Sequence, residues 1–280
     1  MRARYKVQRL ARPAIEAMRL LLLPLLVCSR DITPADVSLG QYSAQGELVQ
    51  LRYAGRAVER APPVVGLSGK LGDQAVSVLL RLRGLSPLSR DAEVLPSFEV
   101  LDDVLLCSAG YAPDCRAVLV QAAVITQSHR LLFGDPPSAE HLCGELLRWM
   151  TRGLRRDERE AVVRPLAVSV LVCDIPKGGL LSVLGNGGET QRRPFVCLGA
   201  VSRAAMRAML TGTAGLGPGE AARTCVSLLL EQSSESAVDV AVVLHSSSKV
   251  ALRKAVRSGR EAMDFVTRVI AGDNGAGEDS

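Results

Sequence analysis

The sequence has few aromatic residues and no basic stripe interleaved with them, which argues against one class of function. Only 3% of its 280 residues are Phe, Trp or Tyr, and the net charge is a modest +5. Proteins that hold single-stranded nucleic acid stack the bases on aromatic side chains along a basic groove. We therefore expect no nucleic-acid binding.

Motifs for metals and nucleotides are also missing. The seven cysteines form no CxxC pair, and most lie in apolar runs, where cysteine acts as a small hydrophobic residue. Their odd count and spacing indicate a reducing compartment and no zinc site. The histidines, His129, His141 and His245, are predicted to be surface or helix-end residues rather than ligands. The turn GNGGE at 185–189 lies between two expected strands, which predicts a hairpin and no phosphate site. We expect no cofactor.

What the sequence does contain is an aliphatic, globular composition. Hydrophobic residues make up 48% and charged residues 22%, and the length suits one large domain or two small ones. A basic N-terminal stretch, followed by the apolar run LLLLPLLVC at 20–28, resembles a targeting peptide. Pro24 breaks this run, which favours a lineage-specific extension or a misassigned start. We expect a disordered or mis-started extension over 1–35, a domain over 36–270 and a disordered tail over 271–280.

Hydrophobic periodicity predicts alternating groups of strands and helices. An amphipathic helix over 46–60 runs into Pro62-Pro63, and the run LAVSVLVCDI predicts a central strand buried on both faces. The apolar runs on either side of the turn GKLGD at 69–73 predict a hairpin. The helix expected over 113–132 has four apolar residues available for one buried face, Val118, Ala122, Ile125 and Leu132. Further helices are expected over 138–155, 202–210, 220–232 and 249–270, and strands over 64–68, 75–82, 98–100, 104–108, 166–175, 180–184, 194–199 and 238–244. This order predicts two stacked sheets with helices on both outer faces.

One stretch, YSAQGELVQLRYA at 42–54, resembles the signature that opens alpha-type proteasome subunits. Four further segments match in the same order: Val65-Gly66, SAGYAPDCR at 108–116, RPLAVSVLV at 164–172 and LGAVSRAAMRAML at 198–210. The resemblance covers about residues 36 to 265 and is nearest to alpha type-2. It implies an α+β fold, the four-layer αββα sandwich of the N-terminal-nucleophile hydrolases. The helix over 46–60 would then cover the cleft that is the active site in beta-type subunits.

The resemblance also implies a function. It is that of a non-catalytic, structural subunit of the proteasome core particle, which takes part in alpha-ring assembly, substrate-entry gating and ubiquitin-dependent protein degradation. The implied partners are the other alpha subunits of a seven-membered ring, the beta subunits, and a regulatory particle or activators, with no nucleic acid and no membrane. The implied location is the cytoplasm and nucleus. The alternative is a divergent N-terminal-nucleophile hydrolase, or a degenerate paralogue that acts outside the proteasome.

Catalysis in this family requires a freed N-terminal threonine and a nearby lysine. The positions that match the nucleophile, the lysine and the serine before the third helix hold Pro63, Ser97 and Ala200. None of these supplies the required group, so we expect no catalytic residue and no enzyme activity.

The gating residues implied by the resemblance are only partly kept. The gate and lid signature retains Asp36, Tyr42, Gly46, Leu48, Gln50 and Tyr53. Ala35-Asp36-Val37 stands where the family has Tyr-Asp-Arg, and Ala44 replaces a proline. Ser97 replaces the lysine that pairs with the C-terminal carboxylate of activators, so docking at this inter-subunit pocket is expected to be weakened.

Overall fold

The computed structural model describes residues 42–71, 74–83, 98–151, 164–177, 181–185, 188–201, 203–231 and 237–271. The predictions for 1–35, Asp36, Ser97 and the tail from 272 onward lie outside these residues. The chain contacts define two compact units, Met1–Gln50 and Leu51–Ser280. Residues 42–50 are the described part of the first unit, and the fold below is that of the second.

The opening helix, α3 (Val49–Glu59), starts three residues later than predicted. Gly46 has φ +79°, a left-handed conformation that does not continue into a right-handed helix. In the larger unit, Ala54 and Val58 are the buried positions of α3. Their spacing of four residues places them on one face of the helix.

The first sheet is antiparallel and has the strand order β10-β9-β2-β1-β8. Its centre is the predicted hairpin, in which Val64 pairs with Arg81 and Leu71 with Gln74. The strands are β1 (Val64–Leu71), β2 (Gln74–Arg83), β8 (Phe195–Leu198), β9 (Ala237–Leu244) and β10 (Lys249–Val256).

The second sheet is also antiparallel, with the strand order β3-β4-β5-β6-β7. Every residue of its central strand β5 is buried, which confirms the prediction made from the continuous apolar run. The strands are β3 (Glu99–Leu101), β4 (Val104–Gly110), β5 (Val168–Asp174), β6 (Leu181–Leu184) and β7 (Thr190–Arg192).

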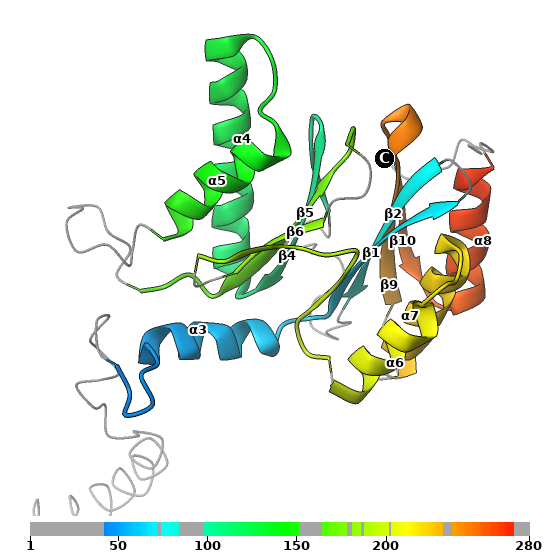
Figure 1. Cartoon of the computed structure of the whole chain (residues 1–280), viewed down its shortest axis with the longest axis horizontal. Helices are drawn as coiled ribbons and strands as arrows, with labels where there is room; N and C mark the ends of the chain where they lie inside the picture. Colours follow the sequence, from blue (N-terminus) through cyan, green and yellow to red (C-terminus); the bar gives the residue numbers. More distant parts are fainter. Residues whose placement is uncertain are drawn as a thin grey trace, which may run out of the picture. The chain divides into compact units, whose positions relative to one another are not determined.

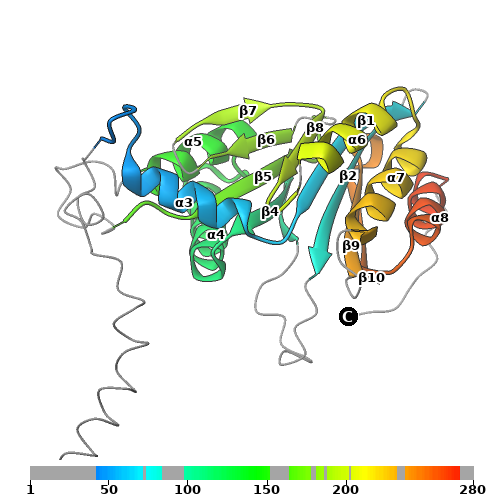
Figure 2. The same ribbon diagram turned by 90° about the horizontal axis from the view of Figure 1, so that it is seen from below.

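The two sheets face each other and carry helices on their outer sides, as Figures 1 and 2 show. An inner core cluster joins residues of both sheets, among them Leu79 and Leu171. Two outer clusters contain side chains of the helices that cover each sheet. The second sheet is covered by α4 (Ala112–Phe133) and α5 (Ala139–Met150), and the first by α6 (Arg203–Thr213), α7 (Pro218–Glu231) and α8 (Gly259–Ile270). This is the four-layer αββα sandwich that the resemblance implied.

The prediction for the C-terminal segment was wrong in part. The helix expected over 249–270 is divided into strand β10, which pairs with β9, and helix α8. Ser258 ends the strand segment and caps the helix, because its Oγ accepts a hydrogen bond from the Glu261 N–H at 3.1 Å. Glu261 reaches back to the Arg257 N–H at 3.2 Å. The sequence SGRE therefore has the pattern of a capping box, which marks a helix start, although Glu261 bonds to the residue before the N-cap.

Two other element boundaries differ from the predictions. Helix α5 ends at Met150, with Thr151 as its C-cap, so it is shorter than the helix expected over 138–155. Strand β7 was not predicted. It pairs with β6 and forms a hairpin with it around the GNGGE turn. The next strand, β8, was expected to follow this turn directly but belongs to the other sheet. Within the described residues, no helix has the length and apolar character needed to cross a bilayer.

Candidate functional site

The start of β1 is where the resemblance would place a nucleophile, and the chain is tightly packed there. Helix α3 leads through Ala61 and Pro62 directly into β1, so Pro63 is an interior residue of a continuous chain. Ala61 and Pro63 are buried. The turn before α6 lies against this segment, because the Ala200 N–H donates to the Ala61 carbonyl oxygen at 2.8 Å. The structure thus brings the segment of Pro63 together with Ala200.

Gly199 makes this close approach possible. It has φ +88°, and a Cβ added there would lie 2.7 Å from the Ala61 oxygen and 2.8 Å from the Pro62 oxygen. Both distances are shorter than van der Waals contact, so any side chain at this position would push the two segments apart. The backbone of the turn before α6 therefore packs directly against the backbone of the segment that enters β1.

The chemical groups at this junction do not make a nucleophile. Pro63, Val64 and Ala200 carry no hydroxyl, thiol or amine side chain. Cys107 belongs to the same inner core cluster as Ala61 and Val64, but burial raises the pKa of its thiol to about 12. A thiol with this pKa is neutral near pH 7 and a poor nucleophile.

The described part of the gate and lid signature forms a compact turn. Tyr42 and Leu48 form an isolated antiparallel bridge. Between them, the Ser43 N–H donates to the Glu47 oxygen at 2.8 Å and the Gly46 N–H donates to the Ser43 oxygen at 2.9 Å. The Tyr42 ring is 66% exposed.

Two more signature residues lie on helix α3. Gln50 is half-buried and ends the first unit. Tyr53 is 39% exposed and lies in the second unit. The functions predicted for the whole signature, including Asp36, therefore stay predictions.

Two of the sequence motifs meet at one junction. Asp114 of the APDCR segment accepts hydrogen bonds from the Arg164 Nη1 and Nη2 atoms, both at 2.7 Å, and from the Ala167 N–H at 2.8 Å. The hydrogen bonds to Asp114 are the main reason why the pKa of Arg164 is raised above its ordinary value. The junction fixes the entry to β5 against the start of α4.

A buried hydrogen-bond chain between the sheets was missed by the sequence reasoning. His245 begins a short 3-10 helix (His245–Ser247) and is only 6% exposed, not a surface residue. Its Nδ1 lies 2.7 Å from the Ile175 oxygen, and its Nε2 lies 3.0 Å from Ser77 Oγ. A carbonyl can only accept, so Nδ1 carries a proton and donates it to the Ile175 oxygen. These two hydrogen bonds connect β2 to the end of β5.

The other two histidines, although distant in sequence, lie close together. The rings of His129 on α4 and His141 on α5 have centroids 5.0 Å apart, and His129 Nδ1 bonds to the Asp135 oxygen at 2.9 Å. Among the described residues, no group of three or more His, Cys, Asp or Glu side chains is arranged to hold a metal ion.

The outer side of α4 carries exposed apolar residues. Val120 and Val124 are 58% and 51% exposed, and Leu131, Leu132 and Phe133 at the helix end are 87%, 77% and 69% exposed. The prediction that Leu132 belongs to the buried face was therefore wrong. The sequence does contain a signal for this exposed apolar surface. Apolar residues lie on both sides of α4, whereas a surface helix normally has one polar face.

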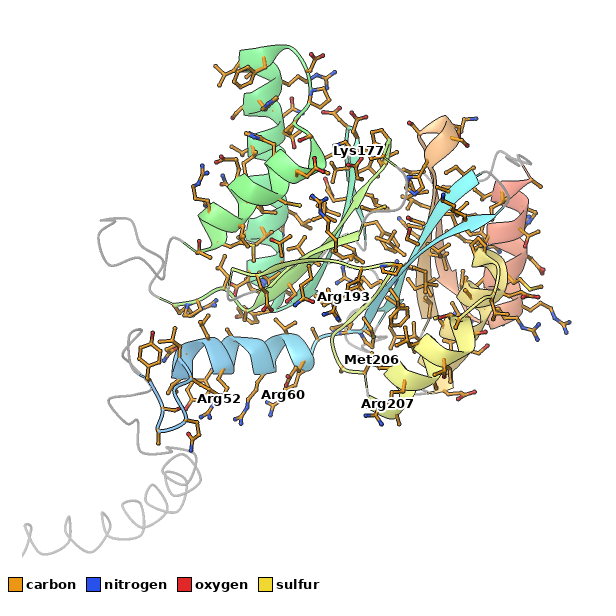
Figure 3. All side chains as sticks on the ribbon, viewed as in Figure 1. Arg52, Arg60, Lys177, Arg193, Met206 and Arg207 are labelled. Atoms are coloured by element: carbon orange, nitrogen blue, oxygen red, sulfur yellow. The ribbon has the colours of Figure 1, made fainter. Side chains whose placement is uncertain are left out.

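A cavity of about 450 Å³ lies beside the edge strands of the two sheets. Its lining is made by β8 and the two residues before it, by Met206 and Leu210 of α6, and by four residues of the second sheet and its turns: Ser169 of β5, Gly185 and Glu189 between β6 and β7, and Gln191 of β7. Figure 3 labels Arg193, on the segment between β7 and β8, and Met206 on α6. No sequence motif predicts this cavity, although Met206 and Leu210 have the spacing of one helix face.

Comparison with known proteins identifies a family. The profile of the family described as "Proteasome subunit" matches residues 88–243, more than half of the chain. Among curated relatives, "Proteasome subunit alpha 2" of Haloferax volcanii is 28% identical over 166 residues, which cover 59% of this chain and 64% of that protein. "Proteasome subunit alpha type-4" of Saccharomyces cerevisiae is 32% identical over 140 residues, which cover 49% of this chain and 52% of that protein.

A third relative has a different alpha type. "Probable proteasome subunit alpha type-5" of Schizosaccharomyces pombe is 28% identical over 149 residues, which cover 51% of this chain and 58% of that protein. The chain thus spans between 52% and 64% of the length of these relatives. All three are named as alpha subunits, and the nearness to alpha type-2 stays a prediction.

Proposed function

Because this chain belongs to the proteasome subunit family, we propose that it is a non-catalytic, structural alpha-ring subunit of the proteasome core particle. The alpha-type names of its relatives favour this class over the catalytic beta type. The proposed task is to help assemble the ring, to contribute to the substrate entrance, and thereby to support ubiquitin-dependent protein degradation in the cytoplasm and nucleus.

The single observation that carries the non-catalytic assignment is the packing at the start of β1. A nucleophile freed at the N-terminus would need an open end at residue 63 or 64, and here that segment is buried and bonded to the turn before α6. The hydrogen bond from the Leu82 N–H to the Pro63 oxygen at 2.9 Å further fixes the segment to β2. Cutting the chain at this place would remove α3 from the fold.

Assembly with other subunits is supported by the exposed apolar surface of α4. Monomeric proteins rarely expose large contiguous apolar patches, and such patches mark interaction sites. Val120, Val124 and the Leu131–Phe133 end would be covered in an assembled particle. We propose neighbouring alpha subunits, beta subunits and a regulatory particle or activators as partners, with docking weakened at the pocket that holds Ser97.

The test is to purify the full chain with an affinity tag from cells that make it and to measure the mass of the native complex. The expected result is a particle of several hundred kilodaltons that contains other proteasome alpha and beta subunits, on the order of the mass of stacked rings of subunits of this size. Recovery of the chain only as a monomer would contradict the proposal. A chain that alone cleaves fluorogenic peptides, with activity lost on Ser97→Ala, would support the hydrolase alternative instead.

A further inference from the structure

The cavity beside α6 lies at the free edges of both sheets. In the described residues, β8 pairs only with β1 and β7 pairs only with β6. An edge strand presents backbone N–H and C=O groups that have no strand partner on one side. The cavity therefore opens beside backbone that can accept another strand.

The lining shows that the backbone edge of β8 itself faces the cavity. Every residue from Arg193 to Leu198 contributes to the lining. Side chains of a strand point alternately to opposite faces, so a cavity on only one face of β8 would be lined by every second residue. A continuous lining is expected where the cavity runs along the edge of the strand.

Apolar side chains flank this edge. Met206 and Leu210 are 36% and 52% exposed, and their spacing of four residues places them on one face of α6. Phe195 of β8 is half-buried and lines the same cavity. Together these residues offer an apolar surface for one or two side chains of an extended peptide.

The charges around the cavity favour an acidic occupant. Arg193 lines the cavity and is exposed, whereas Arg207, which follows Met206 on α6 (Figure 3), is not one of the lining residues. In the described part of the chain, neither guanidinium lies within ion-pair distance of a carboxylate. Glu189 supplies a negative charge, but its side chain packs against Gly185 at the β6–β7 turn. Arginine residues at an interface pair strongly with carboxylates.

We propose that this groove, formed by Arg193–Leu198, Met206 and Leu210, binds an extended acidic segment of a partner protein. The segment adds a strand to the free edge of β8, places an aliphatic or aromatic side chain against Met206 and Leu210, and pairs a carboxylate with Arg193. Main-chain hydrogen bonds would supply affinity, and the side-chain contacts would supply selectivity. The inference does not rest on ring assembly, and it can be tested on the full chain alone.

The test uses a fluorescein-labelled, end-capped peptide in which Glu alternates with Leu or Phe, and measures its binding to the full chain by fluorescence anisotropy. Two matched peptides accompany it: one has Lys in place of every Glu, and one is N-methylated at alternate backbone amides. The acidic peptide is expected to bind at least about tenfold more tightly than either, because one loses charge complementarity and the other loses strand pairing.

Variants of the chain locate the binding site. Arg193→Glu and Met206→Glu, both at exposed positions, are each expected to weaken binding of the acidic peptide by about tenfold. Arg260→Glu, at an exposed position on α8, is the matched charge control and should leave binding unchanged. Unchanged thermal unfolding of all three variants shows that the fold is kept.

Several outcomes would overturn the proposal. Equal binding of the acidic and lysine peptides would remove the charge argument, and equal binding of the N-methylated peptide would remove strand addition. Binding that Arg193→Glu and Met206→Glu leave intact would place the site elsewhere. Binding of decanoate in the groove, in the absence of peptide binding, would identify a small amphiphile site instead of a protein-docking site.

Discussion

Asp114 and Arg164, fifty positions apart in the sequence, form a two-point ion pair at the entrance to β5. The two carboxylate oxygens of Asp114 each lie 2.7 Å from one terminal nitrogen of Arg164, and Asp114 also accepts the Ala167 N–H at 2.8 Å. The Asp114 side chain is 7% exposed, whereas that of Arg164 is 48% exposed. The carboxylate is therefore the buried centre of the junction, and the guanidinium is its partly solvated partner.

Replacing Asp114 with Ala should destabilise the fold more than replacing Arg164 with Ala. Loss of Asp114 leaves the buried Ala167 N–H without a partner, which costs about 1–3 kcal/mol. Loss of Arg164 leaves the buried carboxylate with two favourable contacts, the Ala167 N–H and the N-terminal turn of α4. Urea unfolding of both single variants measures the difference. Asp264→Ala, at an exposed position of α8, is the control and should change the unfolding free energy little. Equal losses for Asp114→Ala and Arg164→Ala would mean that the ion pair, not the backbone contact, stabilises the junction.

Gly199→Ala should destabilise the protein more than Gly134→Ala, although both glycines have almost the same φ. Gly199 has φ +88° and would place a Cβ 2.7 Å from the Ala61 oxygen, whereas Gly134 has φ +86° and open space around its Cβ position. Both substitutions carry a left-handed backbone cost of roughly 1–2 kcal/mol. Only Gly199→Ala adds a clash with backbone that cannot move without opening the start of β1.

The difference in unfolding free energy between Gly199→Ala and Gly134→Ala therefore measures how closely the segments at Ala61 and Ala200 are packed in the proposed closed site. Differential scanning calorimetry of the two variants supplies the comparison. Equal destabilisation would show that the segments at Ala61 and Ala200 separate easily, and would weaken the argument for a closed, non-catalytic site.

Helices and strands were predictable where the sequence contains one clear local pattern, such as a continuous apolar run. The strand β5 was recognised because its apolar run is continuous, and the β1–β2 hairpin because two apolar strands flank a glycine turn. The helix predicted over 249–270 is too long because the segment KVALRKAV also fits a helical pattern. This segment is strand β10, and its pairing with β9 is a long-range contact that local periodicity does not reveal. The capping box at Ser258 was the local signal that separates strand from helix.

The candidate site was less predictable than the fold. Pro63 and Ala200 followed from the resemblance, but the hydrogen bond from Ala200 to Ala61, two residues before Pro63, depends on a turn that the sequence alone does not position. The Ser77–His245 bond and the cavity beside α6 join residues that are distant in sequence. No spacing rule connects such residues, because the packing of the two sheets brings them together.

The contact of α5 with the β5–β6 segment and with strand β7 should depend on pH. Glu140 accepts from Lys177 Nζ at 2.8 Å and from Arg192 Nη2 at 3.2 Å. The hydrogen bond from Lys177, followed by its charge, lowers the pKa of Glu140 below the ordinary value of 4.5. A lowered pKa in the folded state means that the contact stabilises the protein above pH 4.5 and that this stabilisation is lost as the pH falls through the folded-state pKa.

Glu140→Gln should therefore lower the melting temperature slightly at neutral pH and have a smaller effect in acid. The effect should shrink in high salt, because all three side chains are exposed to solvent. Glu231→Gln, at an exposed position of α7, is the control and should show no such pH dependence. A Glu140→Gln effect that is constant from acid to neutral pH would show that the carboxylate charge does not contribute.

The exposed apolar end of α4 should be needed for assembly and not for folding. Leu131 and Phe133 are 87% and 69% exposed, so Leu131→Glu and Phe133→Glu leave the buried core unchanged. They should lower the melting temperature of the isolated chain only slightly, through the lost ring contact of Phe133 with His129 and the added negative charge at the end of α4. In an assembled particle the two introduced glutamate side chains would be buried without partners, at a cost on the order of several kcal/mol each. The double variant is therefore expected to be recovered outside the large particle, whereas Gln127→Glu, on an exposed turn of the same helix, should be incorporated normally. The measurement is the fraction of tagged chain that sediments with other proteasome subunits on a glycerol gradient. Normal incorporation of the double variant would show that the α4 end stays exposed in the particle and that another surface carries the assembly contacts.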